Sequence, residues 1–167
     1  MARTLVRRVS HERLRERLLR SGLPCDLEAE RAAIGAVLLA PNGHSKRLVR
    51  RAYSGHFYDP AHGWLWEELG TALVKCKLSL DDEREIAEWL SRGNVLRRYR
   101  EKYGASLWWE IDSCTNCFWW HGDYFIDRII EVAKIRAKIL TACENLQTAL
   151  DLADDWRAKQ KWRGVTA

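Results

Sequence analysis

Proline is scarce in this sequence, and long apolar runs are missing. The three prolines are Pro24, Pro41 and Pro60, and no alternation of apolar and polar residues lasts long enough to indicate a β-strand. A membrane-spanning helix needs roughly 18 or more consecutive apolar residues, and no stretch approaches that length. Arginines also interrupt every apolar stretch near the N-terminus, which excludes a secretory signal. We therefore expect a helical protein with no membrane partner.

Cysteine is present, but not in the pattern of a disulfide framework. The five cysteines are odd in number and irregularly spaced along the 167 residues. Disulfides persist in oxidising compartments and are rare in reducing ones. We therefore expect a reducing, cytoplasmic location.

Positive charge is concentrated at the N-terminus. The net charge is +5, and the seven arginines of residues 1–20, set against Glu12 and Glu16, account for all of this excess. We assign residues 1–22 to an arginine-rich N-terminal arm or helix. The guanidinium group of arginine matches the geometry of phosphates, so we expect that the arm can contact DNA. The alternative is a solvated helix with internal ion pairs. The predicted nucleic-acid contacts are Arg3, Arg7, Arg8, Arg13, Arg17 and Arg20.

Helical spacing recurs over residues 23–104, and capping residues mark several helix ends. Asp26 is placed to cap the helix that follows it. Asp59 before Pro60 is the clearest helix start, since proline is favoured at the first helical position. Gly104 is typical of a helix end. We assign this segment to a helical bundle.

The last predicted helix differs from the others in length. Nothing interrupts it from Asp123 to about Leu152, and its roughly thirty residues would span about 45 Å. A short aromatic helix, "ASLWWEI", precedes it. We assign residues 105–152 to a helical hairpin and 153–167 to a polar C-terminal tail. The predicted fold class is all-α: a small helical bundle followed by a helical hairpin with a long C-terminal helix.

Apolar residues of this hairpin predict self-association. Adjacent helical positions point about 100° apart, so a two-helix hairpin cannot easily bury both Trp108 and Trp109. Aromatic residues are favoured in the centres of protein interfaces; a core filled within the monomer is the alternative. The predicted self-association residues are Trp108, Trp109, Trp119, Trp120, Ile126, Ile129 and Ile130.

Cys114 and Cys117, with His121 four residues later, are weak candidates for a metal site. Zinc prefers four thiolate or imidazole ligands, and the sequence has no second C-x-x-C motif. Free cysteines packed beside aromatic residues are the favoured alternative, so we expect no metal and no other cofactor. The acidic residues 81–85 lack a nearby histidine and are better explained as a helix start. No catalytic residues are predicted.

Three segments, in this order and spacing, resemble the N-terminal domain of DnaB-type replicative DNA helicases. They read "LPCDLEAERAAIGAVLLAPNG", "FYDPAHGWLWEEL" and "LSLDDEREIAEWLSRGNV". The run from Tyr124 through Arg136 resembles the family's terminal hairpin helix, so the resemblance covers residues 23 to about 150. The matching positions are Pro24, Glu28, Ala29, Glu30, Gly35, Leu38 and Leu39, then Phe57, Tyr58, His62, Leu65 and Leu69, then Leu80, Asp81, Trp89 and Leu90.

This resemblance implies a hairpin that pairs between subunits in a ring collar, where primase and loader proteins dock and no active site is present. The sequence departs from the family in two ways. The hairpin tip reads "CTNCFWWHGD" where the family has a small polar turn, and the chain stops where the linker to the motor is expected. A P-loop requires G-x-x-x-x-G-K-[ST], and none of the ten glycines is followed by lysine.

We therefore expect a protein that is not an enzyme but a non-catalytic module in DNA replication. It would form a homo-oligomer through its hairpin and dock a replicative helicase, a primase or a helicase loader. The alternative is a small DNA-binding regulator that uses the arginine-rich arm.

Overall fold

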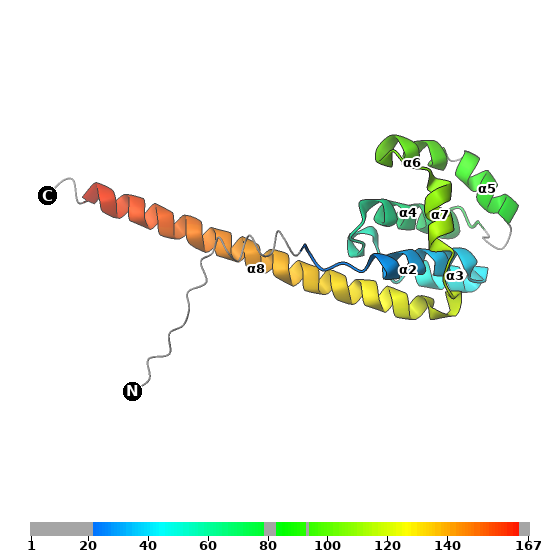
Figure 1. The fold of residues 1–167 in the computed structure, drawn as a ribbon, viewed down its shortest axis with the longest axis horizontal. Helices are drawn as coiled ribbons and strands as arrows, with labels where there is room; N and C mark the ends of the chain where they lie inside the picture. Colours follow the sequence, from blue (N-terminus) through cyan, green and yellow to red (C-terminus); the bar gives the residue numbers. More distant parts are fainter. Residues whose placement is uncertain (1–21, 79–82, 93, 164–167) are drawn as a thin grey trace, which may run out of the picture.

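The computed structural model describes residues 22–78, 83–92 and 94–163, and within these residues it contains helices and no strand (Figure 1). The predicted all-α fold class is confirmed. The predicted helix in the arginine-rich arm lies outside the described residues. The α-helices are α2 (Leu27–Leu39), α3 (Asn42–Val49), α4 (Pro60–Gly70), α5 (Glu83–Arg92), α6 (Val95–Tyr103), α7 (Leu107–Cys114) and α8 (Gly122–Arg163). Shorter turns are η1 (Ser54–His56), the π-helical η2 (Thr71–Lys75) and η3 (Trp119–His121).

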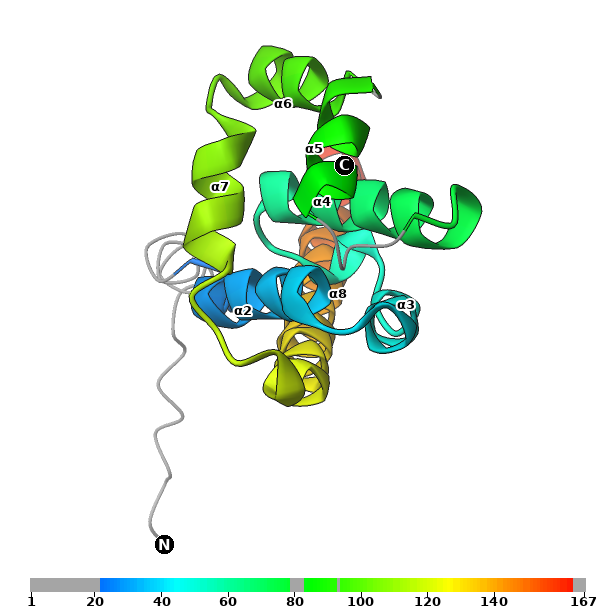
Figure 2. The ribbon, with the colours of Figure 1, turned by 90° about the vertical axis from the view of Figure 1, so that its right-hand side faces the viewer.

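Helix α2 lies at the centre of the globular part. It packs against α3, α4, α7 and the first turns of α8 (Figure 2). Two glycines permit these close approaches. A Cβ atom on Gly35 would lie 1.8 Å from the carbonyl oxygen of Cys114, and one on Gly122 would lie 2.9 Å from Cβ of Ala36. The ends of α7 and α8 therefore approach α2 at positions that admit no larger side chain.

The capping signals read from the sequence are confirmed. Asp26 Oδ1 accepts a hydrogen bond from the Ala29 backbone N–H at 3.1 Å. Asp59 accepts from the Ala61 backbone N–H at 2.8 Å, and Pro60 is the first residue of α4. Gly104 ends α6 in the left-handed conformation, with φ of 68°. The inner face of α4 and η2 is fully buried (Leu65, Leu69, Ala72 and Leu73).

The last helix is longer than the sequence predicted. It runs for 42 residues to Arg163, beyond the expected end near Leu152 and through most of the segment assigned to a polar tail. No glycine or proline interrupts residues 153–163, so the backbone has no local reason to stop. At 1.5 Å per residue the helix is about 60 Å long, and it projects far from the globular part (Figure 1).

The expected hairpin takes a different form. Helices α7 and α8 both pack mainly against α2 rather than closing along each other. Residues 115–121 carry the chain from one to the other (Figure 2). Gly35 of α2 and Gly122 of α8 permit this arrangement, because neither has a side chain that would hold α7 or α8 away from α2.

Within the described residues, no helix is both long and apolar enough to cross a membrane.

Candidate functional site

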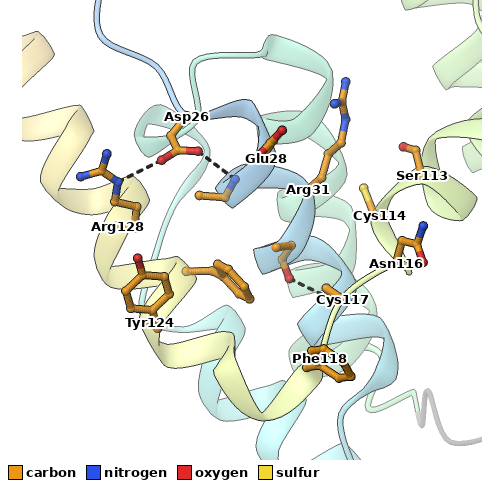
Figure 3. A pocket seen from close by; sticks show the side chains of 13 residues that line it. Asp26, Glu28, Arg31, Ser113, Cys114, Asn116, Cys117, Phe118, Tyr124 and Arg128 are labelled. Carbon is orange, nitrogen blue, oxygen red and sulfur yellow. Dashed lines mark hydrogen bonds and ion pairs between the residues drawn. The ribbon is translucent and has the colours of Figure 1, made fainter.

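A groove opens between α2, the loop after α7 and the first turns of α8 (Figure 3). Its volume is about 550 Å³. Phe118 and Tyr124 lie on its rim with 63% and 66% of their surface exposed, and Cys117 contacts α2 at the Ala32 carbonyl. We call this the α2/α8 groove. Its lining combines aromatic and charged side chains, which suits a protein segment better than a small apolar ligand.

The α2/α8 groove is lined by two arginines in different states, one on each side (Figure 3). Arg128 Nε donates to Asp26 Oδ2 at 2.9 Å, and this hydrogen bond lowers the pKa of Asp26. Arg31 lies opposite, with its Nε 4.0 Å from Oε1 of Glu110. That nitrogen is buried and has no hydrogen-bond partner among the described residues. Arg31 is therefore the less neutralised of the two.

Glu110 is less available to Arg31 because it belongs to a buried triad. His62 donates from Nδ1 to Glu30 Oε2 at 2.8 Å and from Nε2 to Glu110 Oε1 at 2.9 Å. Burial disfavours the charged imidazole, but the hydrogen bonds that it donates to Glu110 and Glu30 outweigh this effect and raise the pKa of His62 to about 9. The same hydrogen bond lowers the pKa of Glu110. At neutral pH the triad therefore holds an imidazolium between two carboxylates.

The triad joins three helices rather than forming a catalytic centre. Glu30 of α2 also accepts hydrogen bonds from the backbone N–H groups of Tyr58, at 2.6 Å, and Asp59, at 3.2 Å. His62 and Glu30 are 1% and 2% exposed, so no substrate can reach them. Two residues from separate matching segments, Glu30 and His62, thus meet in space. The sequence did not identify their third partner, Glu110. Its one recognisable feature in the sequence is an acidic side chain in the first turn of α7.

The candidate metal ligands Cys114, Cys117 and His121 do not come together as a metal site. Cys114 is buried, and burial raises the pKa of its thiol to about 12. The Cys117 thiol donates to the Ala32 carbonyl at 3.4 Å, and His121 is exposed beside Phe118. No group of three or more histidine, cysteine or acidic side chains is placed to hold a metal in the described part of the chain.

The predicted self-association residues divide between surface and core. Trp108, Trp109 and Trp120 are exposed. Trp119 is half-buried beside His44, and Ile130 is half-buried against the core. Ile126 and Ile129 are 0% and 2% exposed inside the monomer, so the prediction that they face a second subunit is wrong. They occupy the first turns of α8, where the helix is covered by α2.

Arg136 marks the point where α8 leaves the globular part. The residue is 8% exposed, and its guanidinium donates to the carbonyls of Pro24 at 3.2 Å and His56 at 3.0 Å and lies over the Tyr58 ring. From Leu140 to Leu152 every side chain that the structure describes is exposed. Within this stretch and just before it, apolar residues recur at alternating spacings of four and three, the spacing of a coiled-coil seam. These residues, here called the α8 seam, are Ile135, Ile139, Ala142, Leu146 and Ala149.

The six arm residues predicted to contact nucleic acid, Arg3, Arg7, Arg8, Arg13, Arg17 and Arg20, lie outside the described residues. Their role stays a prediction.

Comparison with solved structures identifies a similar fold. The crystal structure of the N-terminal domain of DnaB helicase from Mycobacterium tuberculosis matches 79% of this chain and 89% of its own, with a TM-score of 0.63 and 22% sequence identity. No protein-family model and no curated protein matches the sequence. The resemblance read from the sequence is thus confirmed at the level of the fold: the chain has the fold of the N-terminal domain of DnaB-type helicases.

Proposed function

We propose that this chain is a non-catalytic module in DNA replication that self-associates through the α8 seam and docks a replication protein. The observation that carries the proposal is the free half of α8. A single helix that stands clear of its own core gains little from packing, and most helical stability in proteins comes from packing of an apolar face. We therefore expect the exposed seam to pack against a second helix.

A second copy of this chain is the occupant that the seam supports. Its apolar positions alternate by four and three over four turns, from Ile135 to Ala149, and two such helices interlock when their seams face each other. The seam starts where Arg136 ends the contact with the globular part. It is therefore continuous with, but not covered by, the monomer core.

Light scattering after size-exclusion chromatography tests this. The wild-type chain at tens of micromolar should have the mass of a dimer or a larger oligomer. The double variant Ile139→Asp/Leu146→Asp places two charges in the seam and should be monomeric, because a charge buried in an apolar interface is strongly unfavourable.

Thr141→Asp/Thr148→Asp is the matched control, since it adds the same charges to the same stretch on the opposite side of the helix. It should keep the wild-type mass. A wild-type monomer, or equal dissociation of the two double variants, would overturn the proposal. Ile129→Asp is not an informative test because Ile129 belongs to the monomer core.

The docked protein, in this proposal, is a replicative helicase, a primase or a helicase loader. The support is the fold, which the chain shares with a helicase domain, together with the exposed aromatic rim of the α2/α8 groove. Large aromatic side chains beside an arginine are the residue types that contribute most to protein interfaces.

A further inference from the structure

A second concave surface lies between α6 and the start of α7, apart from both the α8 seam and the α2/α8 groove. The cleft has a volume of about 350 Å³ and is lined by Leu96, Arg97 and Arg100 of α6 and by Leu107 and Trp108 of α7, with Ala105 and Ser106 between them. We call it the α6/α7 cleft. In both ribbon views α6 and the start of α7 lie on the side of the globular part away from α8 (Figures 1 and 2).

Buried residues anchor both helices that form the walls of the α6/α7 cleft. Tyr99 of α6 is 1% exposed and packs in an aromatic cluster with Trp64 and Tyr103. The Tyr103 hydroxyl donates to the Pro60 carbonyl at 2.8 Å. Leu107 fixes the start of α7 with 1% exposure. The cleft is therefore formed before any ligand arrives, which lowers the cost of binding.

The exposed groups in the α6/α7 cleft are cationic and aromatic. Trp108 is 49% exposed. Arg97 has only a loose, exposed contact with Glu101, at 3.8 Å, and such pairs contribute little. No ion pair engages Arg100 among the described residues. By contrast, the neighbouring Arg98 donates two hydrogen bonds of 2.8 Å to the Glu68 carboxylate. The cleft therefore has two available guanidinium groups beside a free indole.

We propose that the α6/α7 cleft binds single-stranded nucleic acid, with a base stacked on Trp108 and the adjoining phosphates held by Arg97 and Arg100. An aromatic face beside arginines is the arrangement that binds single strands without sequence preference. The volume lies at the small end of the range for ligand sites, about 300 to 1,000 Å³, which suits one nucleotide unit of a strand. An acidic peptide would satisfy the arginines but would leave the indole without a stacking partner.

The test uses the full chain and a fluorescein-labelled oligothymidylate of about 20 nucleotides, longer than one such binding site, with binding followed by fluorescence anisotropy. Trp108→Leu keeps an apolar side chain in the cleft, which Leu96 and Leu107 also line, but removes the aromatic face. It should raise Kd at least about fivefold, the contribution of one stacked base. Arg97→Ala/Arg100→Ala should reduce the salt dependence of log K by about 0.7 for each phosphate that the variant no longer neutralises.

Two matched controls separate the cleft from general surface effects. Trp109→Leu alters the adjacent and more exposed tryptophan, and Lys102→Ala removes a positive charge from the same helix; neither residue lines the cleft. Both should leave Kd unchanged. Equal effects of Trp108→Leu and Trp109→Leu, or no binding by the wild type, would overturn the proposal.

Cross-linking distinguishes the cleft from the arginine-rich arm, which every variant retains. An oligonucleotide carrying 5-iodouracil should cross-link to the peptide that contains Trp108, as identified by mass spectrometry. Adducts found only in residues 1–20, or tighter binding of polyglutamate than of DNA, would also count against the cleft. Light scattering on each variant reports self-association separately, so the two proposals can fail independently.

Discussion

His62 is the residue on which the packing of three helices converges. From its place in α4 the imidazole donates hydrogen bonds to Glu30 of α2 and Glu110 of α7. Its removal would take this charged partner from the buried Glu30 and leave Glu110 with the 4.0 Å contact to Arg31. Removing one partner of a buried ion pair typically costs about 3 to 5 kcal/mol. The triad is therefore a structural joint whose strength depends on protonation.

We predict that the free energy of unfolding falls as the pH rises from about 6.5 to about 9. The folded-state pKa of His62 is raised to about 9, above the ordinary value of 6.5, so its stabilisation is complete below 6.5 and is lost as the pH rises through 9. One proton accounts for a slope of at most about 1.4 kcal/mol per pH unit.

Urea denaturation at a series of pH values measures this slope. The variant His62→Gln should be less stable at pH 6 and should lack the decline above pH 6.5. A variant that keeps the full decline would show that another group titrates in this range. Glu110 acts in the opposite direction, since its lowered pKa gives a contribution that is lost only in acid.

At the scale of single helices, the packing of α2 against α7 depends on the absence of a side chain at Gly35. The carbonyl of Cys114 occupies the space where a side chain at position 35 would begin. Gly43 in α3 is a useful contrast, because nothing lies within 4 Å of the Cβ that it lacks. Gly35 and Ala36 are small residues in the sequence, but the sequence does not identify the helices that pack there.

Gly35→Ala should destabilise the chain by about 1 to 3 kcal/mol or more, because the backbone of α7 must move to admit the methyl group. Gly43→Ala should cost nothing and can stabilise α3 by up to about 1 kcal/mol, since alanine is the better helix former. Urea titrations of both variants measure the difference. Equal stabilities would mean that α7 does not approach α2 as closely as described.

The existence and type of the elements were largely predictable from local signals. Asp59 with Pro60 and the left-handed Gly104 each satisfy a requirement of the backbone itself, so their effect does not depend on distant residues. The roles of Ile126 and Ile129 were not predictable in this way. Their spacing marks an apolar face, but whether α2 or a second subunit covers that face is a property of the assembled molecule.

For the molecule as a whole, α8 divides into a covered half and a free half with different environments. Ile126, Ile129 and Val132 are buried, whereas the stretch after Leu140 is exposed. An isolated stretch of helix opens easily in water, so the free half should depend on self-association for its protection, while the covered half should not.

Amide hydrogen exchange tests this division. In the wild-type oligomer both halves of α8 should exchange slowly. In Ile139→Asp/Leu146→Asp the amides of residues 140–152 should exchange much faster, while those of residues 126–136 stay protected, because local opening follows local packing. Uniform exchange along α8 in the variant would contradict the division at Arg136.

The sequence by itself determined the helical class, the helix starts and the order of motifs that matches the fold of a DnaB-type N-terminal domain, because capping, proline placement and apolar spacing act over one or two turns of chain. Only the tertiary structure decided that Glu110 completes a triad with His62, that α7 crosses α2 instead of pairing with α8, and where the exposed seam begins. Those outcomes depend on which surfaces meet across dozens of residues, and side-chain spacing within one helix carries no information about the identity of its neighbour.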